Sequence, residues 1–489
     1  MCSNPISNET RSQSWVLFIP ALSSRIQFST PAGGGNSIER EYDYVIVGEG
    51  NAGCVRASRW SEDSDVTVLL IETGDLLTSI PLAFIKILKT ATDWSYETVP
   101  EKALNERQMY WPRGKILGDS SAINALIYHH CAPEDFDEWA RNGETGGSHD
   151  DLRPYLLKSE KYTPNTLFPD VKSADRGSTR PWQTGHTSDA AVRSTLIVKA
   201  CESMGVPYNS DLNAARGTLG VAHFSGIVDR KVINVRSSSA STYLTRDVLS
   251  RPNLTIGVIA VRREVILSAG ALASPQILLL SGVGSAVELE DVGVSLVKDL
   301  PAVGRHLSDS GFTWDHLSHP LARLMAMFKW LMFGTGPLSA LGPFSGAFGC
   351  ESSPVKDLTS GPGAPDIELV RSPVVFIHNG FVEPPAGLYE FTAGTIALRP
   401  ESTGSIKLKS NNAWEKPLIR AEYLFSESDM NVVIRGMRFL EWRTRTLLLA
   451  EQIQLLWLGD ADPEKLKEWI RTNSSSLFHP VCLWPRWLV

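Results

Sequence analysis

The first residues able to do chemistry are three closely spaced glycines, Gly48, Gly50 and Gly53. In a G-x-G-x-x-G pattern the first glycine permits a tight turn, the second lets the backbone approach a pyrophosphate, and the third lets a helix pack against a strand. The chemistry they predict is the binding of dinucleotide phosphates at a helix N-terminus. The alternative is a glycine-rich turn in some other α/β protein.

An acidic residue, Glu72, ends the apolar run 66–71 that follows the glycines. A carboxylate at the end of a second strand is suited to bind a ribose hydroxyl. Strand, glycines, helix, strand and terminal acid therefore occur in the order that a dinucleotide-binding unit requires. This order favours an adenine dinucleotide site.

A second polar segment, residues 111–124, has the sequence WPRGKILGDSSAIN. Two basic side chains, two glycines and two serines make it suitable as a loop around an anionic ligand. Its N–H groups and hydroxyls are able to face a flavin ring or a phosphate. A surface turn explains the same composition equally well, so composition alone leaves both interpretations open.

A histidine near the end of the chain, His479, directly precedes Pro480. Residues before proline favour extended backbone, so this side chain is able to project from a rigid segment into a site. Imidazole is the side chain best suited to take a proton near neutral pH. The chain has 10 histidines, however, so this position alone does not single out a base.

The glycines need a strand before them and a helix after them. Residues 44–47 are apolar and β-branched enough for a buried strand, and the helix is expected to run to about residue 60. A second strand and helix are predicted at 264–284, where Ser274 and Pro275 resemble an N-cap and a first helical position. These units predict a doubly wound parallel sheet.

From about residue 312 the pattern changes. Residues 365–425 contain short apolar runs separated by turns, including one at 374–377, and helical patterns follow at 427–445 and 463–471. Strands followed by helices indicate a separate antiparallel-sheet domain of α+β type. The predicted fold class is therefore α/β, a Rossmann-like doubly wound domain, plus this second domain.

Composition excludes several classes of protein. The chain has 489 residues, is 43% hydrophobic and 21% charged, and carries a net charge of −7, which gives no support for nucleic-acid binding. Its six cysteines are scattered and suggest no zinc site. Residues 321–333 favour an amphipathic helix over a membrane span. No clear signal peptide is present, so the sequence leaves the compartment open.

Together these landmarks resemble the glucose–methanol–choline (GMC) oxidoreductases, which are FAD-dependent flavoproteins, and among them look most like fungal aryl-alcohol oxidases. The resemblance covers about residues 42–480. The motifs that carry it are the FAD fingerprint at 48–53 with Glu72, the first signature at 111–124, a serine-rich segment at 236–240, the second signature at 270–284 and a turn at 304–309.

This resemblance implies an FAD cofactor and a small-molecule primary alcohol, aromatic alcohols included, as substrate. His479 falls on the histidine that takes the alcohol proton while hydride passes to flavin N5, and oxygen or another acceptor then reoxidises the flavin. No metal is implied. The implied cofactor-binding residues are Gly48, Gly50, Asn51, Ala52, Gly53, Glu72, Trp111, Arg113, Gly114, Leu117, Gly118, Ser121, Asn124 and Ala125.

The same resemblance predicts how the chain divides into domains. Residues 41–160 and 220–312 are expected to form a discontinuous FAD-binding domain, and 161–219 with 313–475 a substrate-binding domain. Residues 1–40 are expected to be a poorly ordered leader. Residues 476–489 are expected to be a truncated remnant of the last FAD-domain segment.

Three departures from the family pattern predict weak or absent alcohol oxidase activity. The chain ends soon after His479, without the segment that carries a second catalytic His or Asn in the family. The region near residue 260 is shortened. Asp119 replaces a glycine of the first signature, where its charge would repel FAD phosphates or a reduced flavin.

Two other functions fit the same motifs. One is a hydroxynitrile lyase, which some members of the family are, with FAD bound but not turning over. The other is an inactive remnant that binds FAD without chemistry. An NAD enzyme is disfavoured, because nothing in the two signatures suits a diffusible nicotinamide.

Overall fold

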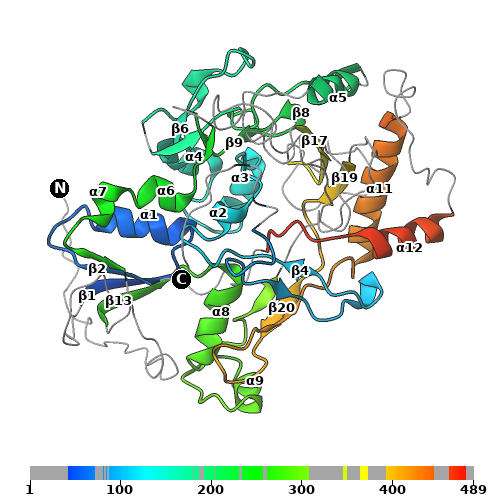
Figure 1. The fold of residues 1–489 in the computed structure, drawn as a ribbon. Coiled ribbons are helices and arrows are strands. Elements are labelled where there is room, and N and C mark those ends of the chain that lie inside the picture. The colour runs from blue at the N-terminus through cyan, green and yellow to red at the C-terminus, as the bar shows by residue number, and fades with distance from the viewer. Residues whose placement is uncertain are drawn as a thin grey trace, which may run out of the picture.

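A computed structural model describes the residues 42–71, 81, 84, 87–179, 181–186, 192–203, 205–230, 234–256, 261–307, 345–349, 364–372, 392–444 and 462–480. Two sheets organise this part of the chain, and Figure 1 shows them on opposite sides of the molecule. The glycine-rich turn follows the first strand of the first sheet, and His479 follows the helix α12 (Pro463–Asn473).

The first sheet is parallel and has the strand order β12-β2-β1-β13. Ile46, Val68 and Leu70 on one face pack against the helices α1, α6 and α7, while Val45 and Leu69 pack on the other. Burial on both faces explains why these strands are continuous apolar runs. The elements are β1 (Tyr42–Val47), β2 (Val68–Ile71), β12 (Leu254–Ile256), β13 (Val261–Leu267), α1 (Asn51–Trp60), α6 (Ser239–Tyr243) and α7 (Arg246–Leu249).

The second sheet is antiparallel and has the order β19-β18-β17-β8. Helix α11 packs on it (Figure 1), and its core includes Phe348, Val370 and Ile396. Strand β8 pairs with β17 in this sheet, although it lies in the range 220–312 that was expected for the FAD-binding domain. A domain boundary drawn by sheet membership would therefore fall after β8. The elements are β8 (Gly220–His223), β17 (Ser345–Gly349), β18 (Ile367–Ser372), β19 (Thr392–Ala397) and α11 (Glu427–Thr444).

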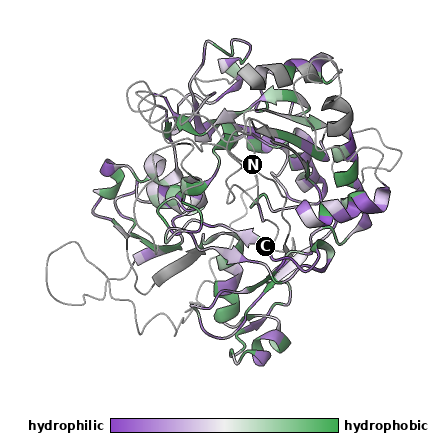
Figure 2. Cartoon of the chain, turned by 45° about the vertical axis from the view of Figure 1, so that its right-hand side comes forward, coloured by the Kyte–Doolittle hydropathy of each residue, from purple (hydrophilic) through white to green (hydrophobic). Residues whose placement is uncertain are grey.

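Smaller elements connect these two sheets, and hydrophobic residues occur in all parts of the molecule rather than in one central band (Figure 2). A third sheet joins β16 (Arg305–Leu307), β20 (Gly404–Lys407) and β21 (Leu418–Arg420). Five strand pairs are β3 (Tyr96–Glu97) with β4 (Tyr110–Trp111), β5 (Ile127–Tyr128) with β9 (Ser225–Gly226), β6 (Glu160–Tyr162) with β7 (Trp182–Thr184), β10 (Val228–Asp229) with β11 (Val235–Arg236), and β14 (Val283–Gly284) with β15 (Lys298–Asp299).

The remaining helices cover these strands. They are α2 (Ser120–Ile123), α3 (Pro133–Arg141), α4 (His149–Ser159), α5 (Val192–Ser203), α8 (Gly270–Leu280), α9 (Ala286–Asp291) and α12 (Pro463–Asn473), with short 3-10 helices at Lys102–Leu104 and Ser173–Asp175. Among the described residues, no helix has both the length and the apolar character needed to cross a membrane.

The predicted fold class is confirmed, since a parallel α/β sheet and a separate antiparallel sheet are both present. The predicted cap at Ser274 and Pro275 is wrong, because α8 begins five residues earlier, with Ala269 as its N-cap and Gly270 as its first residue. Leu272 in that first turn is buried, so packing extends the helix toward β13. The predicted leader 1–40, the strand 374–377, the helix 321–333 and residues 481–489 lie outside the described residues.

Candidate active site

A turn made of glycines follows β1 and begins α1. Gly48 has φ of +97°, in the left-handed region that glycine tolerates. A Cβ on Gly48 would lie 2.6 Å from the carbonyl oxygen of Ser268, and a Cβ on Gly53 would lie 1.9 Å from the carbonyl oxygen of Gly48. Gly48 therefore allows contact with the turn after β13, and Gly53 allows α1 to pack closely on the turn that follows β1.

Helix α1 begins at this turn, and its N-cap residue has no side chain with which to cap the first backbone donors. Its N-cap is Gly50, and its first turn holds no acidic residue. Helix α8 begins at the same edge, at Gly270, because β1 and β13 are parallel neighbours. The first N–H groups of a helix have no partner within it, so two helix N-termini offer donors and positive dipole ends at this edge.

Residues of the first signature close the other side of the turn. The N–H of Gly118 donates to the carbonyl oxygen of Glu49 at 3.1 Å. Ser121 Oγ donates to the carbonyl oxygen of Gly118 at 2.6 Å and accepts from the N–H of Ser239 at 3.0 Å. Segments near residues 50, 120 and 239 are thereby joined into one cradle, which we call the phosphate cradle.

Arg236 holds the far end of the first signature. Its Nη1 donates to the carbonyl oxygens of Ser121 and Asn124 at 3.1 and 2.8 Å and to Asn124 Oδ1 at 2.8 Å. Its Nη2 donates to the carbonyl oxygen of Pro81 at 2.9 Å, and burial lowers the pKa of Arg236 to about 9. The sequence indicated the serine-rich segment 236–240 but not this role of Arg236, although an arginine directly before a serine run was a signal for it.

The segment that carries His479 is fastened to the first signature. Arg113 Nη1 donates to the carbonyl oxygen of Phe478 at 2.9 Å, and the edge of the Phe478 ring meets Tyr110 at a centroid distance of 6.0 Å. Phe478 has φ of +69°, which is strained for a residue with a side chain. Its N–H donates to Ser476 Oγ at 2.9 Å. These contacts hold a strained backbone directly before the histidine, an arrangement that is common at functional sites.

His479 combines an accessible ring with a strongly desolvated environment. Its side chain is exposed to solvent, yet burial among the surrounding protein atoms lowers its pKa to about 4. The positive charge of Arg113 and the proximity of His129 contribute to this lowering, after burial. With this lowered pKa the imidazole of His479 is neutral at physiological pH.

His129 belongs to an aromatic group on the antiparallel sheet. Its ring centroid lies 5.4 Å from that of Phe348 and 6.5 Å from that of Phe224. Burial lowers the pKa of His129 as well. Ala125 and Leu477 pack on the same apolar cluster, so this face of the antiparallel sheet adjoins the His479 segment.

The structure separates the predicted cofactor-binding residues into groups. Trp111 lies in the core, fully buried, with its indole Nε1 donating to the hydroxyl of Tyr423 at 2.8 Å. Ala125 lies on the sheet side and Glu72 lies outside the described residues. Those at or beside the phosphate cradle are Gly48, Gly50, Asn51, Ala52, Gly53, Gly114, Leu117, Gly118, Ser121 and Asn124, while Arg113 contacts the His479 segment.

A separate cavity of 160 Å³ lies between α12, β19 and the region after β21. Ile396, Tyr423 and Trp469 are among the residues that line it. Neither His479 nor a glycine of the phosphate cradle lines this cavity, so it is separate from the candidate site.

The backbone of the phosphate cradle is suited to bind a dinucleotide diphosphate, but one side chain beside it is not. Its glycines, its two helix N-termini and the Ser121–Ser239 contact form a donor set for an anion. Asp119 is the exception: its Oδ2 lies 3.2 Å from the position of a Cβ on Gly50. The departure noted in the sequence therefore brings a carboxylate to the place where a phosphate would approach.

Comparisons with known proteins agree with this geometry. The family model described as GMC oxidoreductase matches residues 42–259 and 257–310. The chain is 36% identical to Dehydrogenase str4 of Strobilurus tenacellus, over 90% of this chain and 85% of that protein. It is 30% identical to Alcohol dehydrogenase [acceptor] of Pseudomonas putida, with the same coverage of 90% and 85%.

A solved structure of a fungal aryl-alcohol oxidase has the same fold, with a TM-score of 0.74 at 22% identity over 91% of this chain and 90% of that one. The predicted family is confirmed by the match to its model and by relatives that align over nine-tenths of the chain. The chain therefore belongs to the GMC oxidoreductases, a family of enzymes that use FAD.

Proposed function

We propose that this chain oxidises a primary alcohol to the aldehyde with bound FAD, and that His479 is the base that takes the hydroxyl proton. The observation that carries the proposal is the bond from Arg113 to the carbonyl oxygen of Phe478. It fastens the histidine segment to the same first signature that forms one wall of the phosphate cradle. Cofactor site and base are thereby joined, although 365 residues separate the two bonded positions.

The diphosphate of FAD would lie on the start of α1, against Gly50, Asn51 and Ala52, with Gly118 on the opposite side. When bound, FAD supplies a two-electron acceptor, which no protein side chain provides. Gly48 and Gly53 are needed for the turn that would carry this contact, because a side chain at either position would collide with backbone atoms. The protein itself must position the alcohol and remove its proton.

A neutral imidazole is required for that proton transfer. Burial keeps the pKa of His479 low, so the imidazole is unprotonated at neutral pH, which is the state a general base needs to accept the hydroxyl proton. The rings of His129, Phe224 and Phe348 pack together on the neighbouring sheet face, with the two phenylalanines buried in the core and His129 partly buried. A site wall that includes His129 on this aromatic cluster would favour a flat, apolar substrate, which supports an aromatic alcohol as the substrate class.

Flavin absorbance tests this function directly. Purified protein is incubated with excess FAD, freed of unbound cofactor and mixed without oxygen with a benzylic primary alcohol. We expect bleaching of the flavin bands and formation of the aldehyde. A hydroxynitrile lyase would leave the flavin oxidised while releasing aldehyde from a hydroxynitrile. Protein that binds no FAD at millimolar concentration would contradict the proposal.

Replacing Arg113 with glutamine tests how the base is held. The cation that lowers the pKa of His479 is removed, so the acidic limb of the pH–rate profile moves to higher pH. Loss of the bond to Phe478 should also lower kcat by about tenfold, because the imidazole is less well positioned. Arg113→Lys, which keeps the charge, should lower kcat with little movement of the limb. If Arg113→Gln leaves the limb in place, Arg113 does not act on His479.

A further inference from the structure

Asp119 has an unusual place in the fold. Its Oδ2 lies 3.2 Å from a Cβ position on Gly50, the N-cap of α1, and 4.0 Å from a Cβ position on Gly270, the first residue of α8. Helices α1 and α8 have 10 and 11 residues, so both have substantial dipoles. The carboxylate therefore lies between two helix N-termini, where an anion is electrostatically favoured.

The backbone at Asp119 supports this placement. Its φ of +43° and ψ of −127° belong to a region that glycine adopts and other residues avoid. A Cβ on Gly114 would lie 2.4 Å from the carbonyl carbon and oxygen of Asp119, so the loop packs tightly behind it. Ser120 Oγ donates to Asp119 Oδ1 at 3.2 Å. The loop thus directs the side chain toward the cradle at a cost in backbone strain.

We propose that the Asp119 carboxylate is an internal competitor for the pyrophosphate of FAD, so that the chain binds its cofactor weakly and exchanges it. This inference rests on the proposed FAD site. A carboxylate and a phosphate are both anions that seek the same helix N–H groups. FAD must therefore either displace the side chain from the cradle or accept its repulsion at close range.

Three proteins are compared by titration of FAD, with quenching of flavin fluorescence as the measure of binding. Asp119→Gly removes charge, volume and strain, and is expected to lower the Kd roughly tenfold to a hundredfold. Asp119→Asn removes the charge but keeps the volume, and is expected to fall between wild type and the glycine variant. The matched control is Asp65→Asn, which removes one exposed carboxylate after α1 and should leave the Kd unchanged.

Salt provides a second measurement that a change in packing would not alter. Added salt screens charges, so it should weaken the repulsion in wild type. Added salt should therefore raise the Kd of wild type less than it raises the Kd of Asp119→Asn, or should lower it more. Thermal unfolding without FAD checks that each variant is folded. If the Asp119→Gly variant is not folded, the comparison is made with Asp119→Asn alone.

The outcomes separate this inference from the FAD site on which it rests. Tighter binding by both Asp119 variants, with the control unchanged, supports internal competition. If wild type retains FAD through gel filtration and the Asp119→Gly variant has the same Kd, the internal competition is wrong but the FAD site stands. Absence of FAD binding in every variant overturns both.

Discussion

Substituting glutamine for His479 is expected to lower the rate constant for alcohol oxidation by about 10²–10⁴-fold at saturating FAD. The reason is that the proton of the alcohol would lose its acceptor while the cofactor site stays intact. Glutamine keeps a polar side chain of similar length, so the strained backbone at Phe478 should be retained. Anaerobic stopped-flow measurement of flavin bleaching gives this rate constant without interference from the oxygen half-reaction.

His149→Gln is the matched control for this experiment. His149 lies at the start of α4, where its ring packs against Phe136 at a centroid distance of 6.1 Å, and it contacts none of the site residues described above. The control should bleach at the wild-type rate. A fall of only a few-fold for His479→Gln, with FAD bound and the protein folded, would mean that another group takes the proton.

Replacing Glu160 with alanine is expected to reduce the free energy of unfolding by about 3–5 kcal/mol. Glu160 Oε1 and Oε2 accept from Arg176 Nε and Nη2 at 2.9 Å each, and neither side chain is exposed to solvent. Thr184 Oγ1 donates to Glu160 Oε2 at 2.7 Å, and Arg176 Nη1 donates to Asp211 Oδ1 at 3.2 Å. The alanine variant would leave the buried guanidinium with Asp211 and the more distant Thr184 hydroxyl, at 3.2 and 3.5 Å.

The pKa of Glu160 agrees with this expectation. Burial by itself would raise it, but the hydrogen bonds and charge of Arg176 lower it below the ordinary value of a glutamic acid. A carboxyl whose pKa is lower in the folded state stabilises the fold above its unfolded pKa. This stability is lost as the pH falls through the lowered value. Wild type should therefore lose stability on acidification more steeply than Glu160→Ala.

Chemical denaturation of two further variants completes the test. Glu62→Ala breaks the partly exposed Arg59–Glu62 pair of 2.7 Å and should change stability by about 0–1 kcal/mol. Replacing Glu160 and Arg176 together with methionine removes both charges and should cost less than Glu160→Ala alone. If Glu160→Ala costs no more than Glu62→Ala, the buried network does not stabilise the fold.

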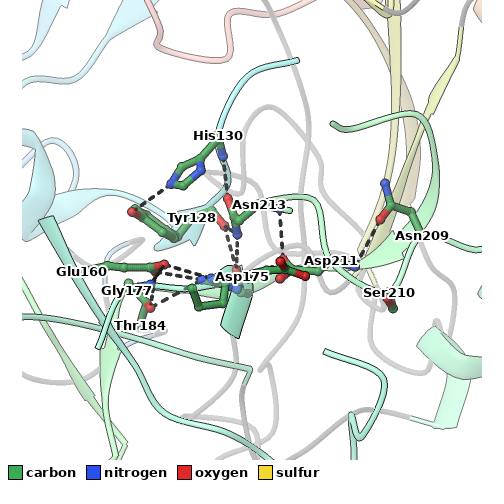
Figure 3. Close-up of polar contacts among 12 residues, drawn as sticks. Tyr128, His130, Glu160, Asp175, Gly177, Thr184, Asn209, Ser210, Asp211 and Asn213 are labelled. Atoms are coloured by element: carbon green, nitrogen blue, oxygen red, sulfur yellow. Dashed lines mark hydrogen bonds and ion pairs between the residues drawn. The ribbon is translucent and has the colours of Figure 1, made fainter. Parts of the chain in front are cut away.

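This network also supports the region beside the candidate site. Asn213 Oδ1 accepts from the N–H of His130 at 2.6 Å, and Asn213 N–H donates to Asp211 Oδ1 at 2.9 Å (Figure 3). Asp211 in turn pairs with Arg176. The residue next to His130 is His129, which influences His479. Loss of Glu160 should therefore also loosen the backbone on which His129 is carried.

The sequence alone determined the elements whose signals are local. The strand 44–47, the glycines after it and the helix to about residue 60 were predicted, and the structure has β1 (Tyr42–Val47) and α1 (Asn51–Trp60) there. Apolar β-branched runs and glycine spacing depend on neighbouring residues, so they can be interpreted without knowledge of the rest of the chain. The family followed from the order of such motifs, and the comparisons confirm it.

Only the tertiary structure decided which distant segments meet. Ser274 resembled a helix cap, but burial of Leu272 moved the start of α8 to Gly270. The bond from Arg113 to Phe478 and the place of Asp119 between two helix N-termini both depend on contacts between segments far apart in the chain. Such contacts arise when strands pair and helices pack, and no local pattern encodes them.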